Sequence, residues 1–231
     1  MGDMVMSAGE TSMMWTRMPG HSWAGTAASF LAMWIAMMGA MMLPSLVPAL
    51  WRHRACVRRA GCARADACTA LAGAGYFGVW AAVGVIVFPF GAAAAHAAAQ
   101  LPSLARLAPI IAGVAVLFAG VVQRSAWKTR QLVVCRESAA RVHAHAPVAR
   151  DAWRHGVRLG VHCVGSCGAL TAAALLIGAM DLRVMAVITT LITAERLAPS
   201  DARVVRAIGD AVVVVGLVLL ARAVGFGGQG L

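Results

Sequence analysis

Two thiols lie one helical turn apart in one of several apolar stretches, at Cys163 and Cys167. A spacing of four residues places both side chains on one face of a helix, so the two thiols can coordinate one metal ion together. Thiolates are soft ligands, which favour soft metal ions over hard cations. A free cysteine is equally a small buried hydrophobe, so the pair alone leaves a metal site and simple packing open.

Methionine is the second source of soft sulfur, with 13 residues in the chain. In the first apolar stretch, spacings of three and four place Met33, Met37 and Met41 on one stripe of a helix. Met38 and Met42 lie on the stripe beside it. Several thioethers along one helix can hold or pass Cu(I). Methionine also fills irregular gaps in a bundle or faces lipid, and the stripe by itself favours that interpretation.

The remaining polar groups of the apolar stretches give weaker signals. Glu195 lies near the end of the fifth stretch, where a carboxylate is costly unless it is paired or coordinates a metal. We expect Arg196 or Lys128 to pair with it rather than a metal ion. His162 can add a third ligand beside the thiols, although a single histidine near a helix end is more often interfacial. No catalytic set of Ser, His and Asp or of Cys and His can be assembled, so the sequence does not predict an enzyme.

Membrane helices must position these side chains, because the chain is too apolar for a soluble fold. Of its 231 residues 61% are hydrophobic and 13% charged, and the mean hydropathy is +0.77; a soluble domain is roughly a quarter charged. The sequence predicts an all-α protein, a polytopic transmembrane bundle of about six helices. The apolar blocks, each long enough or nearly so to cross a bilayer, lie at 24–50, 69–90, 106–123, 157–180, 182–198 and 204–224.

Three regions follow from this pattern. Residues 1–23 form a Met-rich external tail, residues 24–224 the transmembrane domain, and residues 225–231 a Gly-rich C-terminal tail. The block at 182–198 is the weakest, because charged residues lie at both of its ends. The block at 69–90 is rich in Gly and Ala, a composition that lets helix backbones approach closely.

The net charge of +11 is explained by topology. With the N-terminus outside, the inner loops hold most of the 20 Lys and Arg residues, namely those within 52–64, 124–158 and 196–206. This asymmetry is what the positive-inside rule predicts, and anionic lipid is the natural partner of the basic loops. A nucleic-acid partner is unnecessary.

The same topology provides a check on the sulfur ligands. The first and fourth predicted helices run in opposite directions, and their depths can be compared. Met41 and Met42 lie toward the inner end of the first helix, while Cys163 and Cys167 lie in the inner half of the fourth. The thiols and thioethers can therefore meet at one level of the membrane.

Three segments resemble a known family. They are MWIAMMGAMMLPS at 33–45, AGVVQRSAWKTRQLVVCR at 119–136, and HCVGSCGAL at 162–170, which is followed by GAMDL and the Glu195-Arg196 pair. The chain resembles bacterial predicted metal-binding integral membrane proteins, formerly a domain of unknown function, some of which are described as copper chaperones for a tyrosinase-type oxidase. This chain departs from the pattern at Gln131 and Ser166, where the family usually has Cys, and at Gly168, where it has Trp.

The resemblance implies a multi-pass protein of the bacterial inner membrane that handles metal. We expect Cu(I) to be bound by Cys163 and Cys167 with Met38, Met41 or Met42, with Met37 and Cys135 as further candidates, and to be supplied to a copper-dependent client enzyme. The other family-motif positions are Pro44, Ser45, Gln123, Lys128, Arg136, Met180 and Glu195. A structural or assembly subunit without metal is an alternative. A small transporter is another, for which only Glu195 and Gln123 indicate a polar path.

Overall fold

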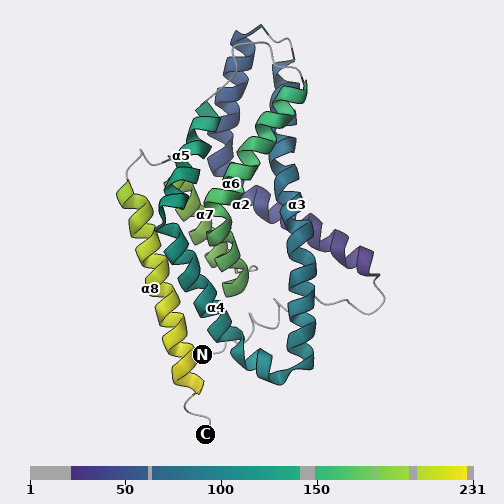
Figure 1. The fold of residues 1–231 in the computed structure, drawn as a ribbon. Helices are drawn as coiled ribbons and strands as arrows, with labels where there is room; N and C mark the ends of the chain where they lie inside the picture. Colours follow the sequence, from purple (N-terminus) through teal and green to yellow (C-terminus); the bar gives the residue numbers. More distant parts are fainter. Residues whose placement is uncertain (1–21, 62–63, 141–148, 179–180, 198–201, 228–231) are drawn as a thin grey trace.

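Every secondary-structure element in the described part of the chain is an α-helix, which confirms the predicted fold class (Figure 1). The computed structural model describes residues 22–61, 64–140, 149–178, 181–197 and 202–227. The helices are α2 (Trp23–Arg59), α3 (Ala65–Gln100), α4 (Pro102–Gln123), α5 (Ala126–Ala140), α6 (Ala149–Gly178), α7 (Leu182–Leu197) and α8 (Ala202–Gly227). The predicted tail at 1–23 lies almost wholly outside the described residues, and α8 continues through Gly227 into the segment predicted as the C-terminal tail.

Four of the described helices, α2, α3, α6 and α8, are long and apolar enough to cross a membrane individually. A fifth span is obtained if Leu107–Gln123 and Ala126–Val134, which are bent by 65° relative to each other, are counted as one. Helix α7 has only 16 residues, shorter than the roughly 20 that a crossing requires. Because charged residues bound the block at 182–198, only a short helix forms there. The described helices thus provide four to five candidate membrane spans, as in a multi-pass membrane protein.

A glycine turn reverses the chain between the two longest helices. Gly61 has φ 79°, a left-handed conformation that favours glycine. Its N–H donates to the carbonyl of Arg58 at 3.1 Å, and the N–H of Ala60 donates to that of Cys56 at 2.9 Å. These bonds satisfy the last carbonyls of α2. Helix α3 can then run back along α2, and the end of α2 and the start of α3 lie together at the top of Figure 1.

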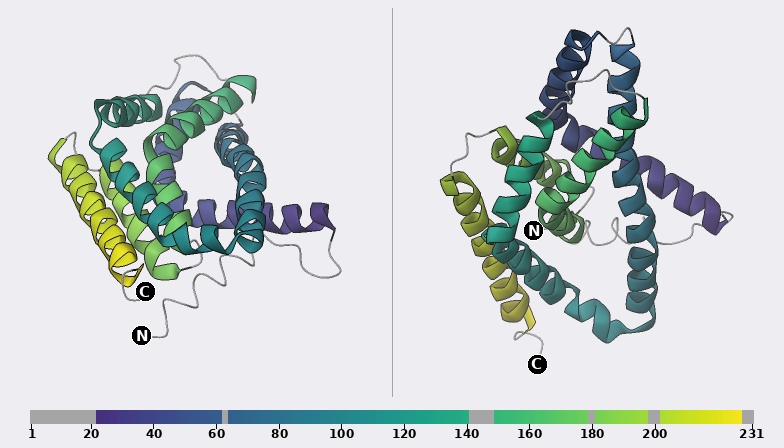
Figure 2. Two further views of the ribbon diagram at one scale, coloured as in Figure 1. Left: turned by 60° about the horizontal axis from the view of Figure 1, so that its bottom comes forward. Right: turned by 45° about the horizontal axis from the view of Figure 1, so that its top comes forward.

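Helix α6 is the centre of the assembly, because it contacts α3, α4, α5 and α7. Helix α2 packs against α3 and α7, and α8 covers the flank of α4 (Figure 2). Prolines Pro44 and Pro48 lie inside α2, and Figure 1 shows this helix changing direction along its length. A proline inside a helix removes a backbone hydrogen bond and is the usual cause of such a bend.

The backbones of α3 and α6 touch through small residues. A Cβ at Gly156 would overlap the carbonyl of Ala72, and one at Gly75 would lie 2.6 Å from the carbonyl oxygen of Trp153. Gly160, one turn after Gly156, would place a Cβ 3.0 Å from the carbonyl oxygen of Tyr76. Gly-xxx-Gly spacing of this kind lets membrane helices approach closely. The close approach expected from the composition at 69–90 is therefore present.

This contact gives a prediction for stability. We expect Gly156→Ala to lower the free energy of unfolding by about 1–3 kcal/mol, because the methyl group forces the two backbones apart. Gly39→Ala is the control, since a Cβ there meets no atom within 4 Å. Thermal unfolding of the purified protein in detergent measures both. An equal loss of thermal stability in the two variants would contradict the proposed role of the α3–α6 contact.

Candidate metal centre

Three sulfur atoms from two helices meet in the interior. The Sγ of Cys163 lies 3.8 Å from the Sδ of Met42 and 4.0 Å from the Sγ of Cys167. Ligands that share one ion at a metal–sulfur distance of about 2.3 Å lie about 3.8 to 4.0 Å apart in tetrahedral or trigonal arrangements. Of the two methionines predicted to lie at the level of the thiols, Met41 and Met42, it is Met42 that contacts Cys163. We call Cys163, Cys167 and Met42 the sulfur centre.

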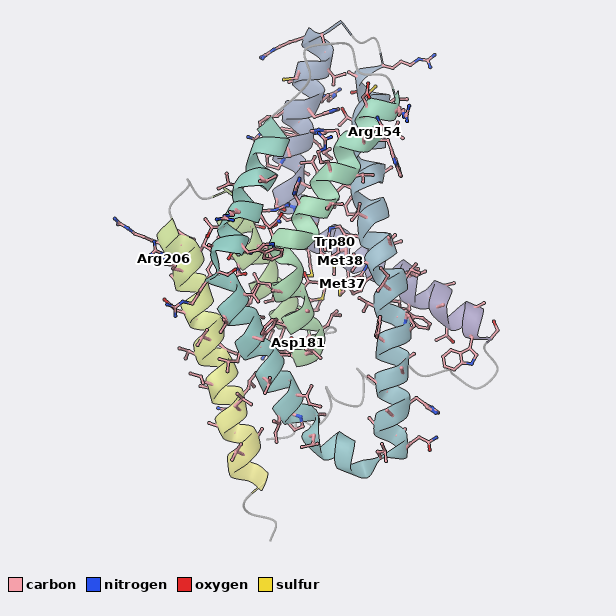
Figure 3. The ribbon with its side chains drawn as sticks, viewed as in Figure 1. Met37, Met38, Trp80, Arg154, Asp181 and Arg206 are labelled. Carbon is pink, nitrogen blue, oxygen red and sulfur yellow. The ribbon has the colours of Figure 1, made fainter. Side chains whose placement is uncertain are left out.

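The sulfur centre is dry. Cys163 and Met42 have 0% of their surface exposed and Cys167 has 1%. Met38 and Met41 are also buried in the same core, whereas Met37 is partly buried against it. Figure 3 shows Met37, Met38 and Trp80 near the middle of the assembly. Three methionines of the two predicted stripes, Met38, Met41 and Met42, are thus buried in the core. Among the recorded contacts, only Met42 brings its sulfur to a thiol.

The sequence reasoning missed Tyr76. Its hydroxyl donates a hydrogen bond to the Sγ of Cys163 at 2.9 Å, and the side chain is fully buried. Tyr76 is the single tyrosine of the chain and lies within a stretch of Gly and Ala, which was the available signal. The close approach of α3 and α6 brings this phenol to the thiol.

The two positions at which this chain lacks the cysteine of the resembled family lie close to the thiols or to their helix. The hydroxyl of Ser166 lies 3.5 Å from the Sγ of Cys167 and donates to the carbonyl of Cys163 at 3.1 Å. Gln131 of α5 lies 3.4 Å from the ring of His162, measured from its Oε1 to Nδ1. His162 is thereby associated with Gln131, and no contact with the sulfur centre is recorded for it.

A buried polar network lies beside Cys167. Lys128 of α5 donates from its Nζ to Glu195 of α7 at 2.9 Å and to the carbonyl of Ser166. Gln123, the last residue of α4, donates to the other carboxylate oxygen of Glu195. Lys128 and Glu195 are each 1% exposed and Gln123 is 0% exposed. The expected pairing of Glu195 with Lys128 is present, and it joins the four helices from α4 to α7.

The Pro44-Ser45 motif connects α7 to the turn that carries Met42. Arg196 donates from Nη1 to the hydroxyl of Ser45 at 2.9 Å, and that hydroxyl donates to the carbonyl of Met42 at 3.0 Å. Pro44 itself is exposed. The serine thus holds a backbone group in a helix that prolines interrupt.

Three predicted positions cannot be placed. The backbones of Cys135 and Arg136 belong to α5, but their side chains lie outside the described residues, as does the whole of Met180. Within the described part of the chain no three His, Cys, Asp or Glu side chains gather as metal ligands.

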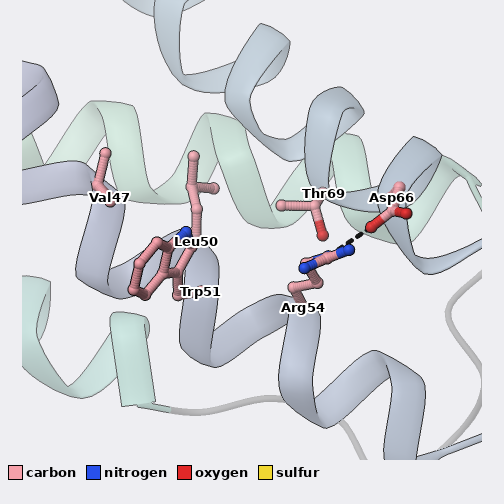
Figure 4. A pocket seen from close by; sticks show the side chains of 6 residues that line it. All are labelled: Val47, Leu50, Trp51, Arg54, Asp66 and Thr69. Atoms are coloured by element: carbon pink, nitrogen blue, oxygen red, sulfur yellow. Dashed lines mark hydrogen bonds and ion pairs between the residues drawn. The ribbon is translucent and has the colours of Figure 1, made fainter.

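A surface pocket of about 300 Å³ offers a different chemistry (Figure 4). It lies between α2 and α3 and contains the ion pair of Arg54 and Asp66. Its lining residues are Val47, Leu50, Trp51, Arg54, Asp66 and Thr69. None of them carries sulfur, so this pocket is not a soft-metal site.

Comparison with protein families gives a match to the family described as "PpoB2: Copper chaperone" over residues 31–219. No curated protein and no solved structure matches the chain. The matched range covers most of the 231 residues and includes the sulfur centre, Tyr76 and the Lys128–Glu195 pair. Two thiols and a thioether in a dry core are also the donor set that suits Cu(I). The chain belongs to the PpoB2 family of copper chaperones.

Proposed function

We propose that this protein binds Cu(I) at Cys163, Cys167 and Met42 and delivers it to a copper-dependent enzyme. The observation that supports the proposal is the meeting of three sulfur atoms from α2 and α6, at 3.8 Å and 4.0 Å, in a core without water access. Soft ligands favour Cu(I) over the hard cations that carboxylate and carbonyl oxygens bind. The role is one of transport and delivery of an ion, without catalysis.

Charge balance supports a monovalent ion. Two thiolates and one Cu(I) carry a net charge of minus one, which is costly to bury without a partner. Lys128, Glu195 and Arg196 together carry a net charge of plus one. Lys128 reaches the carbonyl next to Cys167, and Arg196 reaches the turn of Met42 through Ser45. The loaded centre and its charged neighbours would then be neutral as a whole.

The other methionines of α2 provide weaker ligands along which the ion can move to and from the thiols. Met38 lies one turn before Met42, and Met41 is adjacent to Met42; both are buried. Met37 is partly buried on the neighbouring stripe. Thioethers bind Cu(I) more weakly than thiolates do, so they suit sites through which an ion passes. Cys135, which belongs to α5, is a further candidate ligand for the ion.

The distribution of charge supports an inner-membrane topology with the N-terminus outside. The C-terminal end of α2 and the N-terminal ends of α3 and α6 lie at one end of the assembly (Figure 1). These ends carry Arg52, Arg54, Arg58, Arg59, Arg64, Arg150, Arg154 and Arg158. The positive-inside rule assigns that end to the cytoplasm. The client is an enzyme that takes copper, of the tyrosinase type that the family resemblance implies.

The thiol pair gives the first test of this function. We expect Cys163→Ser/Cys167→Ser to abolish tight binding of one Cu(I), because hydroxyl oxygen is a poor ligand for a soft ion. Anaerobic titration of the detergent-purified protein against a chromogenic Cu(I) chelator measures it. The matched control is Cys56→Ser/Cys68→Ser, which replaces two cysteines that form no disulfide and lie in another part of the fold. Unchanged stoichiometry and affinity in the Cys163 and Cys167 variant would exclude the assigned site.

The methionine contact gives a second test. We expect Met42→Leu to weaken Cu(I) binding by about 10- to 100-fold, since it removes a sulfur and keeps the side-chain volume. Met37→Leu is the control, because its thioether is only partly buried and has no recorded contact with a thiol. The same competition titration compares them. Equal affinities in the two variants would remove Met42 from the ligand set.

The phenol of Tyr76 gives a third test. We expect Tyr76→Phe to reduce Cu(I) affinity by about tenfold, because it removes the hydrogen bond that orients the Sγ of Cys163. The stoichiometry should remain that of the wild type, since no ligand is lost. Phe77→Leu, a change at the neighbouring aromatic ring, controls for altered packing on α3. If Tyr76→Phe bound Cu(I) as tightly as the wild type, the phenol would have no part in the site.

A further inference from the structure

Two histidines from different helices stack on each other away from the sulfur centre. The rings of His53 on α2 and His155 on α6 have centroids 4.8 Å apart and planes at 20°. His53 is only 3% exposed. Its Nδ1 is buried and has no hydrogen-bond partner among the residues that the structure describes.

Packing alone does not explain this imidazole. A buried polar atom without a partner costs about 1–3 kcal/mol, which an apolar side chain of similar size would avoid. The neighbouring turns are apolar. Val57, one turn after His53, and Ala152, one turn before His155, are buried in a cluster with Ala65 and Cys68. His53 therefore occupies a position where the surroundings favour a hydrophobic residue, and its Nδ1 lacks the partner that a buried polar atom normally has.

The histidine pair lies on the same two helices as the sulfur centre. His155 precedes Cys163 on α6 by about two turns, a distance of about 12 Å along the axis. His53 follows Met42 on α2, toward the end where the arginines gather. The same two helices therefore contact each other through sulfur at one level and through imidazole at the other.

We propose that His53 and His155 form a second metal site that takes Cu(I) in exchange with the sulfur centre; the identity of the ion rests on the proposed function. Imidazole nitrogen suits copper. Within the described residues no third His, Cys, Asp or Glu joins the pair, so the site provides fewer ligands than the four that Zn²⁺ takes. Low coordination suits Cu(I), and it also allows the ion to leave.

The ring spacing is compatible with one shared ion. A metal–nitrogen distance of about 2.0–2.1 Å places the ion about 3.2 Å from the centre of each ring, so two rings on one ion have centres at most about 6.4 Å apart. The observed 4.8 Å lies within that limit. The stacked rings do not share an ion in this orientation, so binding requires each ring to turn about χ2, a broad torsion in histidine.

The experiment is a Cu(I) titration of the full-length protein in detergent, combined with X-ray absorption at the copper edge. For the wild type we expect two equivalents, with both sulfur and imidazole nitrogen as ligands. His53→Phe/His155→Phe keeps two stacked rings and removes the nitrogens, and it should lose one equivalent and the nitrogen signal. Cys163→Ser/Cys167→Ser should lose the other equivalent and keep the nitrogen signal. His96→Phe, at an exposed histidine of α3, should change neither.

The variants separate this inference from the proposed function. A histidine variant with two equivalents and unaltered nitrogen scattering would overturn the second site and leave the sulfur centre intact. A cysteine variant that loses both equivalents would also overturn it, because the imidazoles would then hold no ion of their own. Wild-type protein with only one equivalent, bound through sulfur alone, overturns it as well. His53→Gln/His155→Gln repeats the measurement with polar side chains, so that a folding defect of the Phe variant cannot decide the result.

Discussion

Where Gly156 of α6 faces the carbonyl of Ala72 on α3, two backbones touch with no side chain between them. Because a helix is rigid over several turns, this contact also decides which side chains meet further along the pair. Tyr76 then reaches Cys163, the same thiol that Met42 of α2 contacts, while α6 also packs against α4, α5 and α7. A bulkier residue at Gly156 would move the phenol and the thiol apart even though both remained in the chain. Close packing of small residues is thus a condition for the chemistry of the site.

A second constraint acts on α7, which is too short to cross a membrane. Its buried residues Ile188, Ile192 and Glu195 recur at helical spacing, so one face of the helix is apolar except for a single carboxylate. That carboxylate is paired with Lys128, and the next residue, Arg196, bonds to Ser45. Since each unpaired charge would be expensive in this interior, the pairs hold α7 in one position beside the sulfur centre.

Periodicity and depth were sufficient to predict that Met41 and Met42 could lie at the level of Cys163 and Cys167, because both depend only on the position of a residue along its own helix. Which of these residues touch was not predicted. The pairing of Glu195 with Lys128 was likewise accessible from the cost of a buried charge. The contacts of Tyr76 with Cys163 and of His53 with His155 were not predicted. They depend on how far each helix is rotated about its axis, which is decided by close contacts such as that of Gly156. The number of spans was also harder to predict, since the apolar block at 182–198 is interrupted by charges and forms only a short helix.

The burial of the sulfur centre has a chemical consequence for the lifetime of the protein. Thiols and thioethers are the side chains most readily attacked by peroxide, and the reaction requires that the oxidant reach the sulfur. Cys163, Cys167 and Met42 are at most 1% exposed, so a peroxide molecule in the surrounding water has no approach to them. Conversion to sulfenic acid or to methionine sulfoxide is thereby hindered at these three residues. The same packing that keeps water away from these three side chains thus also favours the reduced form of their sulfur atoms.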